Sequence, residues 1–248
     1  MRLSSSRLPR KPLLDVSGRT SFERVVERVR AASTPEVIVL ATTTEAADDD
    51  LAAHARDCGV AVHRGPVRDV LRRLAEAAAA QALDVVVEVD GDDLLCSSEH
   101  MDLGVAHLLA SGADYVAFDG LPLGATPNVL RASALRDAVR WKRYDDTETG
   151  IFRFLVESGR FRVERVASRD PAHRHDTVRM TLDYPEDLAF FRAVYEHLDR
   201  RPGWRLGDLV ALLHERPGLV ATNAGLEERY RAHFAAGLAD MGGAGPAD

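Results

Sequence analysis

The chain has 248 residues, of which 46% are hydrophobic and 29% are charged, a composition typical of a globular domain with a sizeable core. Its formal net charge of −7 argues against non-specific binding to nucleic acid or to an anionic membrane. No apolar run reaches the roughly 20 residues that span a bilayer, and the first residues contain no apolar signal core. The two cysteines, Cys58 and Cys96, are too few for a disulfide framework. We therefore expect a cytoplasmic protein that binds neither nucleic acid nor membrane.

Strands and helices alternate through the first half of the chain. The pattern predicts, in order, a strand and its loop at 36–44, a helix at 45–59, a strand at 60–65, a helix at 66–83, a strand at 84–89, a helix at 98–112 and a strand at 114–118. Pro66 suits the first position of its helix. Such alternation predicts a parallel sheet covered by helices on both faces, with ligands at the carboxyl ends of the strands.

The alternation loosens between residues 119 and 180. In the second half we expect a strand and a helix at 128–141, a helix and an edge strand at 147–166, a helix from Pro185 to Leu198, and a short helix within 205–218. We predict a single domain over residues 1–238, with 119–180 as its less regular lobe. The Gly-rich end, residues 239–248, is expected to be disordered.

The stretch SSSRLPRKPL at residues 4–13 gathers hydroxyls, backbone N–H groups and three cations, Arg7, Arg10 and Lys11. Lysine is otherwise rare, since Lys142 is the only other one among 32 basic residues. These groups are suited to hold a polyphosphate, although the GxxxxGK[ST] pattern of a P-loop is absent. The alternative interpretation of the stretch is a basic, disordered N-terminus.

The order of these residues resembles the nucleotide-binding signature R-x-G-S-x-R-L-P-G-K-x-L of the cytidylyltransferases that activate acidic sugars. This family includes the octulosonate, acylneuraminate and spore-coat polysaccharide types. Further blocks follow in the family's order: VHRGPVRDVLRR, VDGDDLL and TLDYPEDL. The resemblance covers residues 2–198. It implies a three-layer α/β/α sandwich of nucleotidyltransferase type with a mostly parallel, Rossmann-like sheet.

The resemblance also implies a reaction and a site. An acceptor oxygen would attack the α-phosphorus of CTP, and pyrophosphate would leave. Mg²⁺ would be held by Asp92 and Asp183, whose oxygens are ligands that this ion prefers. Arg7 and Lys11 would hold the leaving phosphates, and Arg7, Lys11 and Asp92 are the expected catalytic residues. The expected nucleotide-binding residues are Arg2, Ser5, Arg7, Lys11, Arg64, Asp69 and Arg73.

Each of these assignments has a structural alternative. Asp92 could close an acidic turn after a strand, and Asp183 could favour a helix start through the helix dipole. Arg64, Asp69 and Arg73 could be surface charges on or near a helix. Asp90 and Asp93 could assist the metal, but neither falls on the family pattern.

The chain departs from the family in its missing first strand, at Ser4 and Arg10, which both replace glycines of the signature, and in the lobe at 119–180. The family has a β-strand before its signature, and here that first strand is missing; we expect the natural chain to begin upstream of Met1. Arg10 replaces a glycine of the signature, which would strain the loop if that position needs a positive φ. The lobe at 119–180, expected to shape the acceptor site and a homodimer contact, matches poorly. The acceptor is therefore open between an acidic sugar and a phosphonate.

Two other functions compete with cytidylyl transfer. Residues 90–92 read DGD, which fits the D-x-D metal motif of glycosyltransferases of GT-A type that use a nucleotide sugar. The cation cluster at the start of the chain favours a triphosphate over the diphosphate of such a sugar donor. The third possibility is an inactive nucleotide-binding homologue that lacks the first strand.

Overall fold

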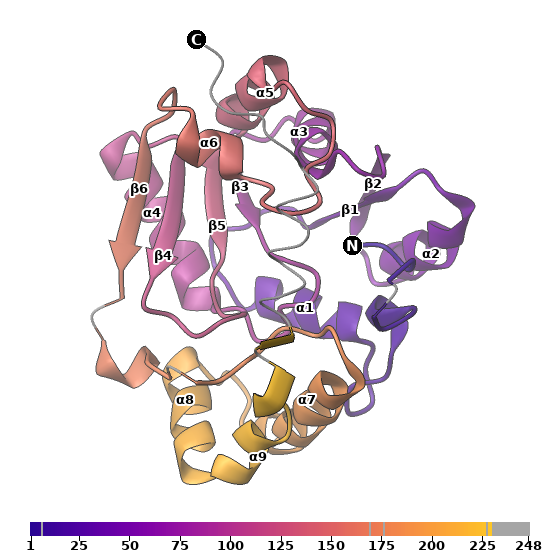
Figure 1. The fold of residues 1–248 in the computed structure, drawn as a ribbon, viewed down its shortest axis with the longest axis vertical. Helices are drawn as coiled ribbons and strands as arrows, with labels where there is room; N and C mark the ends of the chain where they lie inside the picture. The colour runs from indigo at the N-terminus through magenta and orange to yellow at the C-terminus, as the bar shows by residue number, and fades with distance from the viewer. Residues whose placement is uncertain (6, 169, 176, 227, 230–248) are drawn as a thin grey trace.

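The computed structural model describes residues 1–5, 7–168, 170–175, 177–226 and 228–229. Within these residues, the strands form two sheets. One sheet is the parallel pair β1–β2, and the other has the strand order β3-β5-β4-β6 (Figure 1). In the larger sheet, β5 runs antiparallel to both neighbours, whereas β4 and β6 are parallel. The strands are β1 Val39–Thr43, β2 Ala61–Gly65, β3 Val85–Glu88, β4 Tyr115–Asp119, β5 Asn128–Arg131 and β6 Val163–Ala167.

Helices cover both faces of these sheets. Successive side chains of a strand point to opposite sides of the sheet, so the side chains of β4 contact the helices on both faces. Tyr115 and Ala117 pack in one apolar cluster with residues of α3 and α5, whereas Val116 and Phe118 pack in another with Leu108 of α4. The helices of these layers are α1 Ser21–Arg30, α2 Asp49–Asp57, α3 Val70–Ala80, α4 Ser98–Ser111 and α5 Ala132–Trp141. The three-layer α/β/α sandwich expected from the sequence is confirmed.

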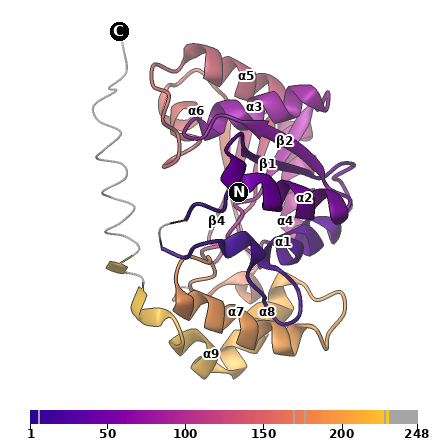
Figure 2. The same cartoon turned by 90° about the vertical axis from the view of Figure 1, so that its right-hand side faces the viewer.

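The later helices gather at one end of the molecule. Helices α7, α8 and α9 lie together below the sheets (Figures 1 and 2). Apolar residues of α7 and α8 pack against Leu94, Leu95 and Leu182, which ties this end to the turn after β3. The remaining helices are α6 Arg153–Glu157, α7 Pro185–Leu198, α8 Leu206–Glu215 and α9 Pro217–Ala221, with 3₁₀ turns η1 Lys11–Leu13, η2 Ala46–Asp48, η3 Pro171–His173 and η4 Ala224–Leu226.

The sequence placed the start of α3 too early. The helix begins at Val70, not at Pro66, because Asp69 caps it: its carboxylate accepts a hydrogen bond of 3.1 Å from the backbone N–H of Arg72. The guanidinium of Arg73 turns back and donates to the Pro66 and Val67 carbonyls at 2.5 and 3.0 Å, which holds the residues before the helix in a loop.

Other elements agree with the sequence. Strand β6 lies at the sheet edge, and α7 starts at Pro185. Across the described ranges, no helix is both long and apolar enough to cross a bilayer. The domain span of 1–238, the homodimer and the cytoplasmic location stay predictions, and the predicted disordered end lies outside the described residues.

Candidate active site

Lys11 lies between two carboxylates that are distant in the sequence. Its Nζ is 2.6 Å from Asp92 Oδ2 and 3.2 Å from Asp183 Oδ1, and it also donates to the carbonyl of Leu182 at 3.1 Å. Lys11 opens the turn η1, Asp92 lies in the turn after β3, and Asp183 directly precedes α7. Burial alone would lower the pKa of Lys11, but the two carboxylates outweigh it and hold this pKa above its usual value.

Asp183 is held rigidly at the start of α7. Arg7 Nη2 reaches its Oδ1 at 2.6 Å, and Arg179 Nη2 reaches its Oδ2 at 2.7 Å. The backbone N–H groups of Asp183 and Tyr184 both donate to Asp187 Oδ2 at 2.9 Å, which caps the helix. The sequence DYPED thus fixes the position of a carboxylate that is only 1% exposed.

The turn after β3 concentrates negative charge beside Lys11. Burial would raise the pKa of Asp92, but the Lys11 ammonium outweighs burial and lowers it. Burial, followed by the charge of Asp92, raises the pKa of Asp90 to about 6 and that of Asp93 well above its usual range. Burial likewise raises the pKa of Glu88, with Asp90 as the next cause. The carboxyl groups of this turn therefore gain from a cation that neutralises them.

The donor atoms of the site suit Mg²⁺. Asp92 and Asp183 offer hard carboxylate oxygens on either side of one cation, the Lys11 ammonium. Mg²⁺ binds through one or two carboxylates together with phosphate oxygens and waters, so two protein ligands are enough. These two residues would hold the ion.

Most of the predicted nucleotide-binding residues border one cavity of about 940 Å³. Arg2 pairs with Glu148 there, at 2.5 Å. Ser5 Oγ accepts a hydrogen bond from the Leu8 N–H at 3.3 Å. The predicted site residues on the cavity wall are Arg2, Ser5, Arg7, Lys11, Arg73 and Asp92.

Arg64 and Asp69 do not border this cavity. Arg64 donates to the carbonyls of Thr43 and Glu45 at 2.7 Å each, which ties β2 to the loop after β1. Asp69 Oδ2 binds the buried ammonium of Lys142 at 2.7 Å, in addition to capping α3. Both residues thus have partners within the folded chain, and Asp69 is buried rather than a surface charge.

Arg10 takes the left-handed backbone conformation where the family signature has glycine, with φ 55° and ψ 25°. Its side chain leads away from the carboxylates and pairs with Asp50 at 2.8 Å, where both side chains are more than half exposed. The expected strain at this position is therefore present. The guanidinium of Arg10 lies on the surface, paired with Asp50.

A second cavity of about 950 Å³ borders the same acidic turn. Its wall includes Arg7, Asp92 and Asp183 together with residues of the 119–180 lobe, such as Asn128 and Arg153. Arg7 Nη1 is buried and has no hydrogen-bond partner among the residues that the structure describes. An unsatisfied buried donor of this kind favours an anionic ligand at the site.

A polar chain behind the turn was missed by the sequence analysis. Tyr115 Oη donates to Asn128 Oδ1 at 2.7 Å, and Asn128 Nδ2 donates to Glu88 Oε2 at 2.9 Å. The pairing of β3 with β5 sets Glu88 directly opposite Asn128. The register between these strands carries no signal in the sequence, so the contact could not be predicted.

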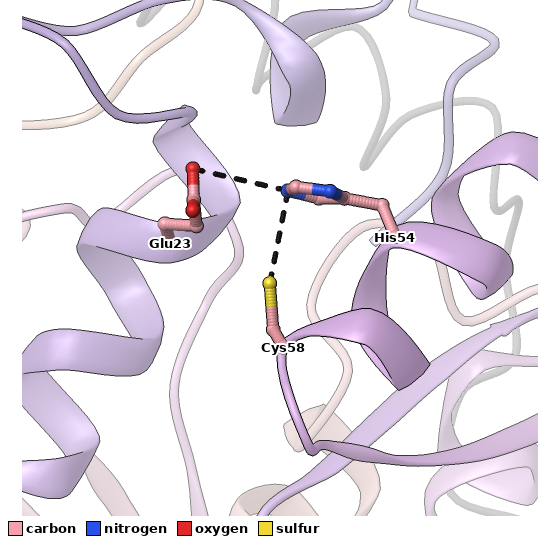
Figure 3. Close-up of side chains that lie close together, drawn as sticks. All are labelled: Glu23, His54 and Cys58. Carbon is pink, nitrogen blue, oxygen red and sulfur yellow. Dashed lines mark hydrogen bonds and ion pairs between the residues drawn. The ribbon is translucent and has the colours of Figure 1, made fainter.

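The structure also brings together Glu23, His54 and Cys58, on α1 and at the end of α2 (Figure 3). His54 Nε2 lies 3.9 Å from both Glu23 Oε2 and Cys58 Sγ. The Glu23 carboxylate closes the capping box of α1 with Thr20, and burial raises the pKa of the Cys58 thiol. None of the three borders either cavity, and the capping box gives the group a structural role.

Three comparisons relate the chain to known proteins. Residues 1–155 match the model of a protein family described as cytidylyltransferase. The chain is 27% identical to the spore coat polysaccharide biosynthesis protein SpsF of Bacillus subtilis, over 87% of this chain and 92% of SpsF. A stretch of 104 residues is 38% identical to the 3-deoxy-manno-octulosonate cytidylyltransferase of Anaeromyxobacter dehalogenans, and covers 41% of each protein. The fold is shared with a cytidylyltransferase structure from Leptospira borgpetersenii at a TM-score of 0.81 and 23% identity, covering 88% of this chain and 93% of that one.

Proposed function

The chain belongs to the cytidylyltransferase family, and we propose that it transfers CMP from CTP to an acidic sugar or phosphonate in a reaction that depends on Mg²⁺. The observation that carries this proposal is the position of the Lys11 ammonium, which contacts both Asp92 and Asp183. The similarity to a 3-deoxy-manno-octulosonate cytidylyltransferase supports an acidic sugar as the acceptor.

The cations of the site are placed for a triphosphate. Arg7 and Lys11 are partly exposed and already bind anionic oxygens, those of Asp92 and Asp183. Phosphate oxygens of CTP can replace these carboxylate partners with the same charge-assisted hydrogen bonds. When bound, Mg²⁺ neutralises phosphate charge and aligns the reacting groups. Asp92 and Asp183 are the residues that would hold it.

The reaction needs no covalent protein intermediate. An oxygen of the acceptor forms a bond to the α-phosphorus of CTP, while the bond from this phosphorus to the oxygen bridging to the β-phosphorus breaks. Pyrophosphate leaves with that electron pair, and the proton of the acceptor passes to solvent. Arg7 and Lys11 stabilise the charge that develops on the pyrophosphate.

The second cavity is the candidate acceptor site. Asn128 and Thr149 offer polar groups there, and Arg2, Arg7 and Arg153 border it. Six carboxyl groups also line it, those of Asp90, Asp92, Asp93, Glu148, Glu157 and Asp183, and Arg2 and Arg153 pair with Glu148 and Glu157. Arg7 Nη1, which has no hydrogen-bond partner within the described ranges, is a donor for a carboxylate or phosphonate oxygen. Because both cavities border Asp92, an acceptor in the second cavity would meet the nucleotide at the acidic turn.

The proposal is tested by an assay that measures pyrophosphate release from CTP. The protein is incubated with CTP, Mg²⁺ and each acceptor from a panel of sugar acids and phosphonates. Asp92→Asn should lower turnover at least about a hundredfold, as expected for loss of one transition-state contact, while the fold stays intact. Asp50→Asn is the matched control, because Asp50 lies on the surface and pairs there with Arg10. Unchanged turnover in Asp92→Asn would contradict the assignment. Binding of a UDP- or GDP-sugar without pyrophosphate release from CTP would favour a glycosyltransferase.

A further inference from the structure

Three metal-ligating side chains meet outside both cavities, beside the start of α1 and the end of α2 (Figure 3). Glu23 lies in the first turn of α1, His54 lies in the last turn of α2, and Cys58 is the residue that ends α2. One carboxylate oxygen, one imidazole nitrogen and one sulfur from these residues all lie within 4.8 Å of one another. Oxygen, nitrogen and sulfur donors of these kinds are the protein ligands of Zn²⁺.

The distances between the donor atoms are close to those around a tetrahedral ion. His54 Nε2 lies 3.9 Å from Glu23 Oε2 and 3.9 Å from Cys58 Sγ. Bonds of about 2.0 to 2.3 Å to a tetrahedral Zn²⁺ place pairs of ligand atoms about 3.4 to 3.6 Å apart. Both distances in the structure therefore exceed these values by only about half an ångström or less, which rotation of partly exposed side chains can close.

Local structure orients two of the three ligands. His54 and Cys58 are four residues apart, so their side chains lie on the same side of α2. The N–H of Cys58 donates to the carbonyl of His54 at 3.0 Å, which keeps the helical spacing up to Cys58. The ring of Phe22 contacts the His54 ring edge-on, with 5.7 Å between the ring centroids. These contacts direct Nε2 toward the other two ligands before an ion binds.

The capping box of α1 explains only one member of the group. It engages Oε2 of Glu23, which accepts a hydrogen bond from the Thr20 N–H at 2.6 Å. A capping box needs neither a histidine nor a thiol. The hydroxyl of Thr20 lies 3.0 Å from His54 Nε2, and an ion would take its place as the partner of this nitrogen. The side chains of Glu23 and His54 are 35% and 27% exposed, so an ion can enter from solvent.

We propose that Glu23, His54 and Cys58 form a binding site for one Zn²⁺ ion, with water as the fourth ligand. As the bond from zinc to Cys58 Sγ forms, the thiol proton passes to solvent, and neutral His54 binds the ion through Nε2. Thiolate and imidazole ligands favour Zn²⁺, whereas Mg²⁺ and Mn²⁺ favour oxygen ligands such as those of Asp92 and Asp183. The two sites therefore take different ions, and the zinc site does not depend on the proposed transfer of CMP.

Zinc at this position would support the segment that carries Lys11. Ser21, in the first turn of α1, donates from its hydroxyl to the carbonyl of Lys11 at 2.5 Å. The N–H of Ser21 donates to the carbonyl of Leu14 at 2.9 Å. An ion that joins Glu23 to the end of α2 holds the same helical turn in place. The role of the ion is thus structural, because it fixes the start of α1 and touches no group of the candidate active site.

Cobalt(II) tests the site without any measurement of activity. Co²⁺ occupies tetrahedral zinc sites, and a bond to a thiolate gives it a charge-transfer band in the near ultraviolet. The chain is freed of metal with a chelator and titrated with Co²⁺ in excess Mg²⁺, which occupies Asp92 and Asp183. The thiolate band should saturate at one ion per chain, disappear when Zn²⁺ is added, and be absent in Cys58→Ser. Cys96→Ala is the matched control and should keep the band.

Three glutamine variants separate metal binding from the capping box. Glutamine closes a capping box as glutamate does, so Glu23→Gln should leave the melting temperature of the metal-free chain nearly unchanged. Glu23→Gln and His54→Gln should each weaken Zn²⁺ binding at least about tenfold, the loss seen when even a partner of a metal ligand is removed. His107→Gln is the matched control, because His107 pairs with Glu164 elsewhere on the surface. Excess Zn²⁺ should raise the melting temperature of the native chain by several degrees, but not that of Cys58→Ser.

Other results would overturn the proposal. A missing thiolate band, or a band that persists in Cys58→Ser, would show that Cys58 binds no ion. Equal Zn²⁺ affinity in Glu23→Gln and the native chain would contradict the set of three ligands. A band that saturates at one ion per two chains would assign the ion to a contact between copies and would refute a site within one chain.

Discussion

Acetylation of the Met1 amino group should change how stability depends on pH. Burial lowers the pKa of this group from 8.0 to about 6, with Arg73 as the next cause. In the unfolded chain the amino group has its ordinary pKa of 8.0. Between pH 6 and 8 the unfolded state therefore binds more protons than the folded state. The free energy of unfolding rises with pH in this window as a result. A difference of two pKa units corresponds to at most about 2.7 kcal/mol. The acetylated chain has no such group and lacks this contribution.

Urea unfolding of both chains between pH 5.5 and 8.5 measures the effect. Relative to the free amine, the acetylated chain should gain up to about 2.7 kcal/mol at pH 5.5, and this gain should fade by pH 8.5. Asp90 and Glu88 do not cancel in the difference, because burial raises the pKa of both carboxyl groups, the charge of the Met1 amine opposes this rise, and acetylation removes that charge. A difference that stays constant across the range would show that the amino group is solvated, and would refute its burial beside the Ala41 carbonyl.

Substitutions at three positions test other parts of the structure by urea unfolding. Arg10→Gly should be more stable than Arg10→Ala by about 1 kcal/mol, because both lose the same surface ion pair and only glycine takes a positive φ freely; equal stabilities would contradict the strain. Gly124→Ala should cost at least about 2 kcal/mol, since φ is +86° and the new Cβ would collide with the Met180 carbonyl; a neutral result would contradict this geometry. Lys142→Met should cost about 3 kcal/mol by leaving the Asp69 carboxylate unpaired, with an unchanged KM for CTP, whereas a raised KM would give Asp69 a role in nucleotide binding.

The sequence predicted the strands for a simple physical reason, because β-branched runs mark buried strands. Asp92 follows such a run, and ligands bind at the carboxyl ends of parallel strands. Its approach to Lys11 and Asp183 could be expected only from the resemblance to the cytidylyltransferases, because neither of these two residues ends a strand. The strain at Arg10 could also be predicted, because this residue replaces a glycine of the signature. The structure confirms it, since Arg10 has a positive φ.

Other features depend on contacts that spacing does not determine. Arg64 and Arg73 belong to one sequence block, yet Arg73 borders the cavity and Arg64 binds the backbone carbonyls of Thr43, the last residue of β1, and of Glu45 in the loop that follows. Pro66 favours a helix start by its own conformation, but the cap at Asp69 and the hydrogen bonds of Arg73 outweigh it. The raised pKa of Glu88 results from burial and from close carboxyl groups, which only the folded arrangement brings together.

The position of a divalent ion beside CTP tests the central claim most directly. Mn²⁺ accepts the same oxygen ligands as Mg²⁺ and gives an anomalous diffraction signal in crystals grown with CTP. We predict one peak within about 2.5 Å of carboxylate oxygens of both Asp92 and Asp183, with the Lys11 ammonium on the phosphates. A peak beside His54 and Cys58, or CTP bound away from Lys11, would contradict the account.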